Sequence, residues 1–313
     1  MNKFVLRQSL LLLLAAFIWG VAFVAQSVGM EYVGPFTFNA VRSVIGGVTL
    51  LPCIAVIGLS RKRSAGAEHA KDTEGQAGHS SSGRRQLASA GIACGILLCV
   101  ATNFQQIGIQ YTTVGKSGFI TAMYIVIVPI VGLFVGKRAG MRIWAAVALS
   151  VLGLYFLCMS GGELRFQRGD LLMLLCAITF SFHIMVVDHF ASLVDGVKLS
   201  CIQFFVSGIL SGIGMFLFER PQLSQIFAAW LPILYAGVLS CGVAYTLQII
   251  GQRGMNPTVA SLLLSMEAVI SVIAGWVILH QRLSVRELSG CVLMLLAIVL
   301  VQLPEKQGRS AHP

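Results

Sequence analysis

Windows of about 20 hydrophobic residues alternate with short polar segments along almost the whole chain. A stretch of that length with almost no charge can cross the hydrocarbon core of a bilayer, roughly 30 Å thick, as one α-helix. The pattern therefore predicts an all-α polytopic membrane protein with ten transmembrane helices. The predicted spans are 9–28, 36–58, 88–109, 115–135, 142–160, 170–188, 198–218, 228–250, 257–279 and 286–303.

The first window follows Lys3 and Arg7, as the hydrophobic segment of a signal peptide would. It lacks a clear cleavage site of small residues, and nine further windows follow, so we expect it to be retained as the first helix. The long connection 61–86 is polar and rich in Gly and Ser, which predicts a disordered loop.

The overall composition agrees with this class of protein. The chain of 313 residues is 57% hydrophobic and 11% charged, against the quarter or so of charged residues in soluble domains. The predicted spans leave no room for a soluble catalytic domain. We therefore expect no enzyme and no cofactor.

The distribution of positive charge predicts the orientation, because cytoplasmic loops are enriched in Lys and Arg. If the N-terminus is inside, the first half places only Lys116 outside, and ten spans return the C-terminus to the cytoplasm. The 61–86 loop is then cytoplasmic as well. The Lys and Arg residues predicted inside in the first half are Lys3, Arg7, Arg61, Lys62, Arg63, Lys71, Arg84, Arg85, Lys137, Arg138 and Arg142. The formal net charge of +10 is thus a topology signal, and we expect no nucleic-acid partner.

The cysteines lie within the predicted spans and form no close CxxC pair, so we interpret them as small buried hydrophobic residues rather than as a metal site. They are Cys53, Cys94, Cys99, Cys158, Cys176, Cys201, Cys241 and Cys291.

The two halves of the chain resemble each other. A shift of 161 residues places "SLLLLLAAFIWG" over "DLLMLLCAITFS", with Trp19 on Phe180. A shift of 142 places Gln106 on Gln248 and the helix of Tyr124 on that of Glu267. Each unit holds five spans, an odd number, so the units 1–160 and 161–313 must face opposite ways across the membrane. Inverted repeats of this kind are typical of transporters that open alternately to each side of a central site.

Four segments resemble EamA-type members of the drug/metabolite transporter superfamily: "AAFIWGVAFVAQ", "FNAVRSVIGGVTLLP", "GFITAMYIVIVPIVGLFVGKR" and "ASLLLSMEAVISVIAGWVILHQRLS". The resemblance covers 9–303 apart from the 61–86 loop. It implies ten helices in two inverted five-helix repeats, a central cavity, and movement of small metabolites, often amino acids outward. The chain departs from the family where Ala268 replaces the Pro after the helix-nine Glu, and where Gln281 replaces a second acid.

Polar residues at mid-depth are the candidate substrate-binding residues. Counting 1.5 Å per residue from Pro257 places Glu267 about 15 Å into the membrane, near its midplane. Arg42 comes roughly 9 Å in from the other face, close enough for its long side chain to reach toward Glu267. The full candidate set is Trp19, Arg42, Asn103, Gln106, Tyr124, His183, Gln248 and Glu267.

Glu267 carries the strongest functional signal, because an isolated charge at mid-membrane costs about 3 kcal/mol or more unless it is paired or hydrated. It either meets a cationic group of the substrate, takes up a proton, or forms a fixed ion pair with Arg42. The amides, Trp19, Tyr124 and His183 also have purely structural roles open to them, as interhelical hydrogen-bonding or packing residues.

Two other classes of protein were weighed against a transporter. Ser117 lies in a "GKSG" segment that resembles the serine motif of rhomboid-type intramembrane proteases. The nearest intramembrane histidine, His183, is predicted about 20 Å below the outer face, too deep to take the proton of a surface serine. A non-transporting receptor or scaffold stays open and is distinguished by a lack of solute flux.

The sequence therefore predicts a carrier of the inner (plasma) membrane for a small polar or amphipathic, amino-acid-like metabolite, working as an exporter by alternating access around a central cavity. Its expected partners are that metabolite and the lipid bilayer. Protons as a second partner and the oligomeric state are left open.

Overall fold

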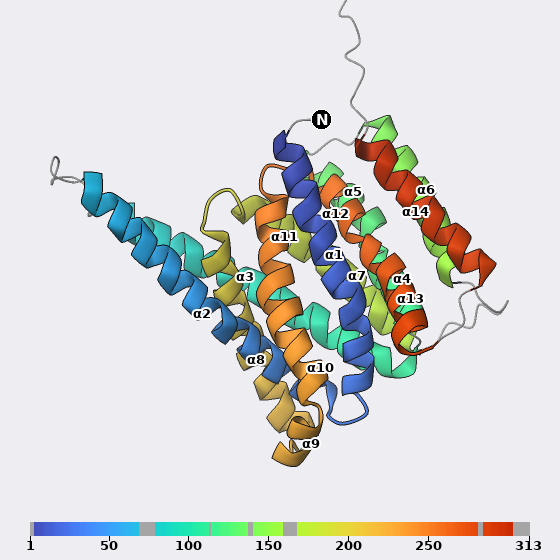
Figure 1. Ribbon diagram of the computed structural model, residues 1–313, viewed down its shortest axis with the longest axis horizontal. Coiled ribbons are helices and arrows are strands. Elements are labelled where there is room, and N and C mark those ends of the chain that lie inside the picture. Colours follow the sequence, from blue (N-terminus) through green and yellow to red (C-terminus); the bar gives the residue numbers. More distant parts are fainter. Residues whose placement is uncertain are drawn as a thin grey trace, which may run out of the picture.

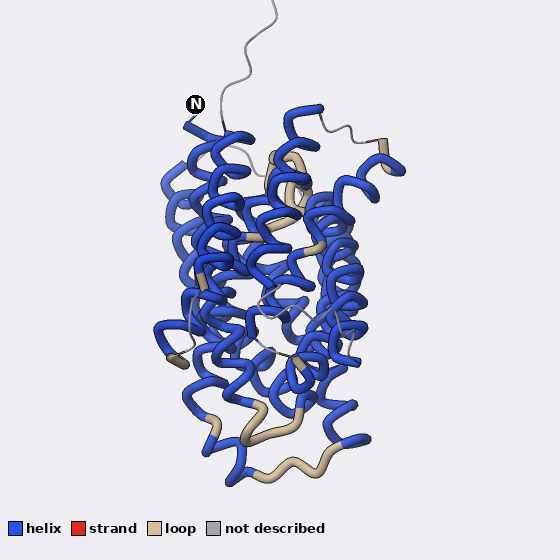
Figure 2. Tube along the Cα trace, turned by 90° about the vertical axis from the view of Figure 1, so that its right-hand side faces the viewer, coloured by secondary structure: helices blue, strands red, loops and turns tan. Residues whose placement is uncertain are grey.

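The computed structural model describes residues 3–68, 79–112, 114–136, 140–158, 168–280 and 284–302. These residues form helices and short connections, without a strand among them. The helices run along the length of the molecule, and most of the connections lie toward its two ends (Figure 2). This part of the chain confirms the predicted all-α class.

The first half contains α1 (Lys3–Gly29), α2 (Pro35–Glu68), α3 (His79–Gly108), the short 3₁₀ turn η1 (Ile109–Tyr111), α4 (Val114–Ala122), α5 (Tyr124–Phe134) and α6 (Met141–Cys158). The second half contains α7 (Arg168–Phe190), α8 (Gly196–Phe218), α9 (Leu223–Ala228), α10 (Trp230–Leu234), the π-helical segment η2 (Tyr235–Ala244), α11 (Tyr245–Gln252), α12 (Pro257–Leu264), α13 (Met266–Ile278) and α14 (Val285–Gln302).

Eight helical stretches in the described residues are long and apolar enough to cross a membrane. They match the predicted spans other than 142–160 and 286–303. Those two regions form α6 and α14, whose apolar parts, Met141–Gly153 and Leu288–Leu300, are shorter. The multi-pass character is therefore confirmed, and the count of ten transmembrane helices stays a prediction.

Two of the long stretches are interrupted near their middle. Met123 separates α4 from α5, and Ser265 separates α12 from α13. At Ser265 the side-chain hydroxyl donates to the carbonyl of Leu262 at 2.8 Å. Such a local bond competes with the regular helical pattern. The interruptions place Tyr124 and Glu267 at the starts of the second helical pieces, where backbone regularity is lost.

The helices of the two halves pack against each other rather than forming separate bundles. The helix α1 contacts α13 and α11, α3 contacts α7 and α8, and α2 contacts α8 and η2. The pair α6 and α14 packs mainly on itself at one edge of the molecule (Figure 1). The centre of the molecule is surrounded by α1, α2, α3, the interrupted helices, α7 and the α10–α11 stretch.

The prediction of a disordered loop over 61–86 is wrong at both of its ends. The helix α2 continues to Glu68 and α3 begins at His79, so the two helices extend together beyond the rest of the bundle (Figure 1). A helix already formed in the membrane extends at little cost through Arg, Lys, Ala and Gln, which favour helices. The middle of the predicted loop, 69–78, lies outside the described residues.

The cysteine prediction needs one correction. Six of the cysteines are buried as expected: Cys94, Cys99, Cys176, Cys201, Cys241 and Cys291. Cys53 is exposed on α2. The side chain of Cys158 lies outside the described residues.

Candidate functional site

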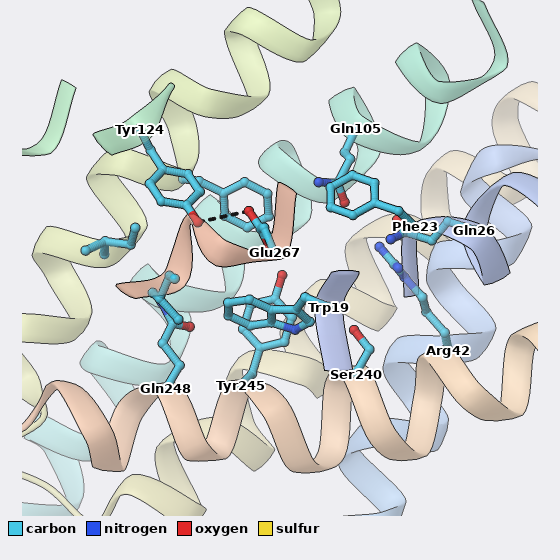
Figure 3. A pocket seen from close by; sticks show the side chains of 13 residues that line it. Trp19, Phe23, Gln26, Arg42, Gln105, Tyr124, Ser240, Tyr245, Gln248 and Glu267 are labelled. Atoms are coloured by element: carbon cyan, nitrogen blue, oxygen red, sulfur yellow. Dashed lines mark hydrogen bonds between the residues drawn. The ribbon is translucent and has the colours of Figure 1, made fainter. Parts of the chain in front are cut away.

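A pocket lies in the middle of the bundle, between helices of both halves (Figure 3). Most of its lining is aromatic or aliphatic, with one carboxylate, one guanidinium and several neutral polar groups. The lining residues are Trp19, Phe23, Gln26, Arg42, Gln105, Tyr124, Phe180, Ile184, Ser240, Tyr245, Gln248, Leu264 and Glu267. An apolar pocket with a few convergent polar groups is the usual form of a small-molecule site.

The Glu267 carboxylate is held by a residue of the other half of the chain. The hydroxyl of Tyr124 donates to Glu267 Oε1 at 2.9 Å. Tyr124 is the first residue of α5 and Glu267 the second of α13, so the bond joins the two interrupted helices at their interruptions. It is the single hydrogen bond to this carboxylate in the described part of the chain. Glu267 is 5% exposed and lines the pocket.

The fixed ion pair of Glu267 with Arg42, one of the three roles left open for this carboxylate, is not formed in this structure. No N···O distance of 4.0 Å or less joins them, although both line the pocket. The Arg42 guanidinium instead lies over the Phe38 ring, with Cζ 5.4 Å from its centroid. Counting helical rise gave the depth of the two residues but not their direction around the helix axis, and depth alone does not bring two side chains together.

Aromatic rings form one wall of the pocket. The Trp19 and Tyr245 rings have centroids 4.5 Å apart and planes inclined at 59°, a tilted arrangement typical of favourable aromatic pairs. The Trp19 Nε1 atom is buried without a hydrogen-bond partner among the described residues. Because a buried indole N–H usually has an acceptor, this donor is available to water or to a bound solute.

Five of the eight predicted site residues line the pocket: Trp19, Arg42, Tyr124, Gln248 and Glu267. The other three are buried between helices outside it. Asn103 donates to the Cys99 carbonyl and to Ser211 Oγ, both at 2.8 Å. Gln106 donates to the carbonyl of Gln26 at 3.1 Å. His183 Nε2 lies 3.1 Å from Gln203 Oε1.

The prediction missed eight lining residues, and helical spacing could have found some of them. Trp19, Phe23 and Gln26 are spaced i, i+4, i+7 and share one face of α1. Tyr245 and Gln248 share a face of α11 in the same way. Ser240 and Gln105 carried no comparable signal, because serine and glutamine are common interhelical residues in membranes.

Polar contacts tie the two halves together at both ends of the bundle. At the end where α4 and α7 begin, Lys116 Nζ lies 2.7 Å from Asp170 Oδ2, and Asp170 is 2% exposed. At the opposite end, where α1 begins and α11 ends, Gln8 Nε2 donates to the carbonyls of Ile250 and Arg253, both at 2.9 Å. Only the first of these contacts involves charge on both partners.

The pocket between these two contacts is narrow. Its volume is about 30 Å³, whereas pockets that hold small molecules have roughly 300–1,000 Å³. Water fits such a space and a metabolite does not. Within the described residues, no cluster of His, Cys, Asp or Glu could hold a metal ion.

Apolar helices long enough to cross a membrane, packed around a buried polar pocket, define an integral membrane protein with a central site. The sequence matches the EamA-like transporter family over residues 6–159 and again over 167–303. The chain belongs to this family. It is therefore a membrane transporter and not an enzyme.

Three relatives of known name agree with this assignment. An uncharacterized transporter of Archaeoglobus fulgidus is 29% identical, with 93% of this chain and 84% of the relative covered. The uncharacterized transporters YoaV and YwfM of Bacillus subtilis are 22% and 23% identical, over 90% and 97% of this chain and 92% and 96% of their own. A solved structure, described only as a crystal structure of a protein, has a TM-score of 0.73 at 18% identity and covers 94% of this chain and 96% of its own. That likeness supports the fold.

Proposed function

We propose that this transporter carries a small polar or amphipathic, amino-acid-like metabolite out of the cell by alternating access around the Glu267 pocket. The observation that carries the proposal is a buried carboxylate at the interruption of one helix, bonded to Tyr124 at the interruption of another. Interrupted helices at mid-membrane are a common device for binding solutes and ions. The substrate-binding residues proposed are those that line this pocket, while Asn103, Gln106 and His183 stay predictions.

The proposal of two inverted repeats has support from the interruptions themselves. Adding 142 to Met123 gives Ser265, so the shift that relates the sequences also relates the two interruptions. Their backbone angles nearly coincide, with φ −61° and ψ −11° at Met123 and φ −61° and ψ −12° at Ser265. Two separate family matches, one to each half, point the same way.

The packing of the helices also agrees with a repeat: contacts between two helices recur between the corresponding helices when the two halves are interchanged. The contacts of α1 with α12 and α13 have their counterparts in the contacts of α7 with α4 and α5. The contact of α3 with α7 has its counterpart in that of α11 with α1. Related halves arranged in this way can rock about a central site. The narrow pocket, with polar contacts between the halves at both ends of the bundle, fits an intermediate of such a cycle.

Cross-linking across the ends tests the alternating-access proposal. In a variant without native cysteines, the pairs Lys116→Cys with Asp170→Cys and Gln8→Cys with Arg253→Cys each join opposite halves. We expect either cross-link to abolish flux of a solute that the parent variant carries, and reductant to restore it, because each bond holds one end shut. Flux that persists at full cross-linking of both pairs would exclude rocking of the halves.

The orientation predicted from charge is part of the proposal and has its own test. Reporter fusions at Gly78 and Pro313 should both give a cytoplasmic signal, because the positive residues of the first half favour that side. The readout is a phosphatase or fluorescent reporter active on one side only. A periplasmic or extracellular signal at either position would contradict an arrangement with ten spans and both termini inside.

The sequence alone left open a receptor or scaffold that binds a solute without moving it, and a flux measurement tests this directly. Saturable flux of any solute in proteoliposomes excludes this alternative. Tight binding without flux supports it. Growth of overexpressing cells on a panel of toxic amino-acid analogues is the most direct way to find the solute, because an exporter confers resistance to what it carries.

A further inference from the structure

Arg42 is a buried cation on the wall of the pocket. Its side chain is 3% exposed and lines the pocket from α2. Among the described residues, no carboxylate lies within 4.0 Å of it, and its Nε atom is buried without a hydrogen-bond partner. The guanidinium lies over the ring of Phe38, which stabilises a cation but accepts no hydrogen bond in the guanidinium plane.

A buried guanidinium without a carboxylate nearby is stabilised by a counter-charge from another source. Leaving a buried charge without its partner is strongly destabilising. Glu267 does not pair with Arg42 directly, because no N···O distance between the two side chains is 4.0 Å or less. Glu219 does not either, because it accepts from the backbone N–H groups of Phe36 and Thr37 at the start of α2. The counter-charge can come instead from a solute that binds when the pocket widens during the transport cycle.

The two charges lie apart in the pocket. In Figure 3 Arg42 lies with Gln26 at the right of the view, whereas Glu267 lies nearer the middle, above Trp19 and bonded to Tyr124. A guanidinium donates two parallel N–H bonds to a carboxylate. With a single cation and the Glu267 carboxylate in the same pocket, a monoanion is favoured over a phosphate dianion, which would be repelled by Glu267 and would need further cations.

We propose that Arg42 is the receptor for a carboxylate on the transported solute. This assignment rests on the proposed transport function of the pocket. It makes Arg42 a specificity-determining residue: solutes with a carboxylate gain the charge-assisted bonds, and amines without one leave the guanidinium unpaired. A site with an unpaired polar group rejects the deficient analogue strongly. Organic cations without an acidic group are therefore poor substrates.

Free amino acids and their amides test the assignment on the wild-type protein. Leucine and phenylalanine are compared with leucinamide and phenylalaninamide, which keep the side chain and ammonium group but lose the carboxylate. The measurement is flux in proteoliposomes, with the shift in unfolding temperature as a binding readout. We expect at least one of the free acids to be carried and its amide to be carried at least tenfold more slowly.

Substitution at Arg42 completes the test. Arg42→Gln should lower flux of the acid at least tenfold and abolish the preference over the amide, while Arg42→Lys, which keeps charge but not the planar fork, should keep part of the preference. Arg286→Gln is the matched control, because Arg286 is exposed and lies over the Tyr155 and Phe156 rings away from the pocket. It should leave the preference unchanged.

The outcomes separate the two proposals. Equal flux of acid and amide in the wild type, or an unchanged preference in a folded Arg42→Gln variant, overturns the Arg42 assignment and leaves the transport proposal standing. If none of the four probes is carried and none raises the unfolding temperature, the proposal of an amino-acid-like substrate is overturned, and the Arg42 assignment fails with it. If the Arg42→Gln variant does not fold, the comparison of free amino acids with their amides on the wild-type protein still tests the Arg42 assignment.

Discussion

Replacing Glu267 by Gln should lower flux of the carried solute by at least an order of magnitude, or remove its dependence on pH, while the protein still inserts and folds. The amide has nearly the shape of the carboxylate, and its oxygen can accept the bond that Tyr124 donates at 2.9 Å. Only the charge is lost. If that charge meets a cationic group of the solute, affinity falls; if it binds a proton during the cycle, the pH dependence disappears.

The measurement is efflux from proteoliposomes over a series of pH values, normalised to the amount of folded protein. Glu31→Gln is the control, because Glu31 is exposed in the turn after α1. Tyr124→Phe removes the hydrogen bond and keeps the carboxylate, which separates loss of charge from loss of the contact. A well-folded Glu267→Gln protein with wild-type flux at every pH would refute the functional role of this carboxylate.

The part of the fold that could be predicted is the part determined by the length of the hydrophobic segments. Hydrophobic length predicts helices that cross a bilayer, and the described helices agree with eight of the predicted spans. It says nothing about where a helix stops once it leaves the hydrocarbon. The extensions of α2 to Glu68 and of α3 from His79 depend on helix propensity in a polar segment, which the loop prediction did not weigh.

The interruptions at Met123 and Ser265 were not predicted. Neither residue is a proline or glycine, the usual markers of a broken helix. The repeat placed the helices of Tyr124 and Glu267 in register, and the structure brings those two residues into contact. An alignment of the halves therefore predicts more about the site than either half examined by itself.

The choice between Gln105 and Gln106 shows how far depth can identify a site residue. Both lie at nearly the same depth on α3, and the prediction selected Gln106. In the structure Gln105 lines the pocket, and Gln106 bonds to the backbone of α1. Adjacent helical residues point about 100° apart, so the outcome depends on the rotation of α3 about its axis. Packing against neighbouring helices sets that rotation, and the sequence of one helix does not contain it.

Gly20 should be among the positions least tolerant of a larger side chain. It lies in α1 next to Trp19, where α1 packs on α13. A Cβ atom added there would clash with the side chain of Ile270 and would lie 2.8 Å from the carbonyl oxygen of Glu267. Overpacking of a core typically costs about 1–3 kcal/mol. We expect Gly20→Val to lower the yield of folded protein several-fold and to lower its unfolding temperature.

Gly212→Val provides the matched control, because a Cβ atom at Gly212 on α8 would meet no heavy atom within 4 Å. The same change of residue is made inside a helix in both variants, so the difference in yield and unfolding temperature reports the contact of α1 with α13. The Gly20→Val molecules that do fold should also carry solute more slowly, because relief of the clash displaces the backbone that holds the Glu267 carboxylate. Equal yield, unfolding temperature and flux in the two variants would mean that α1 does not pack closely on α13 beside the pocket.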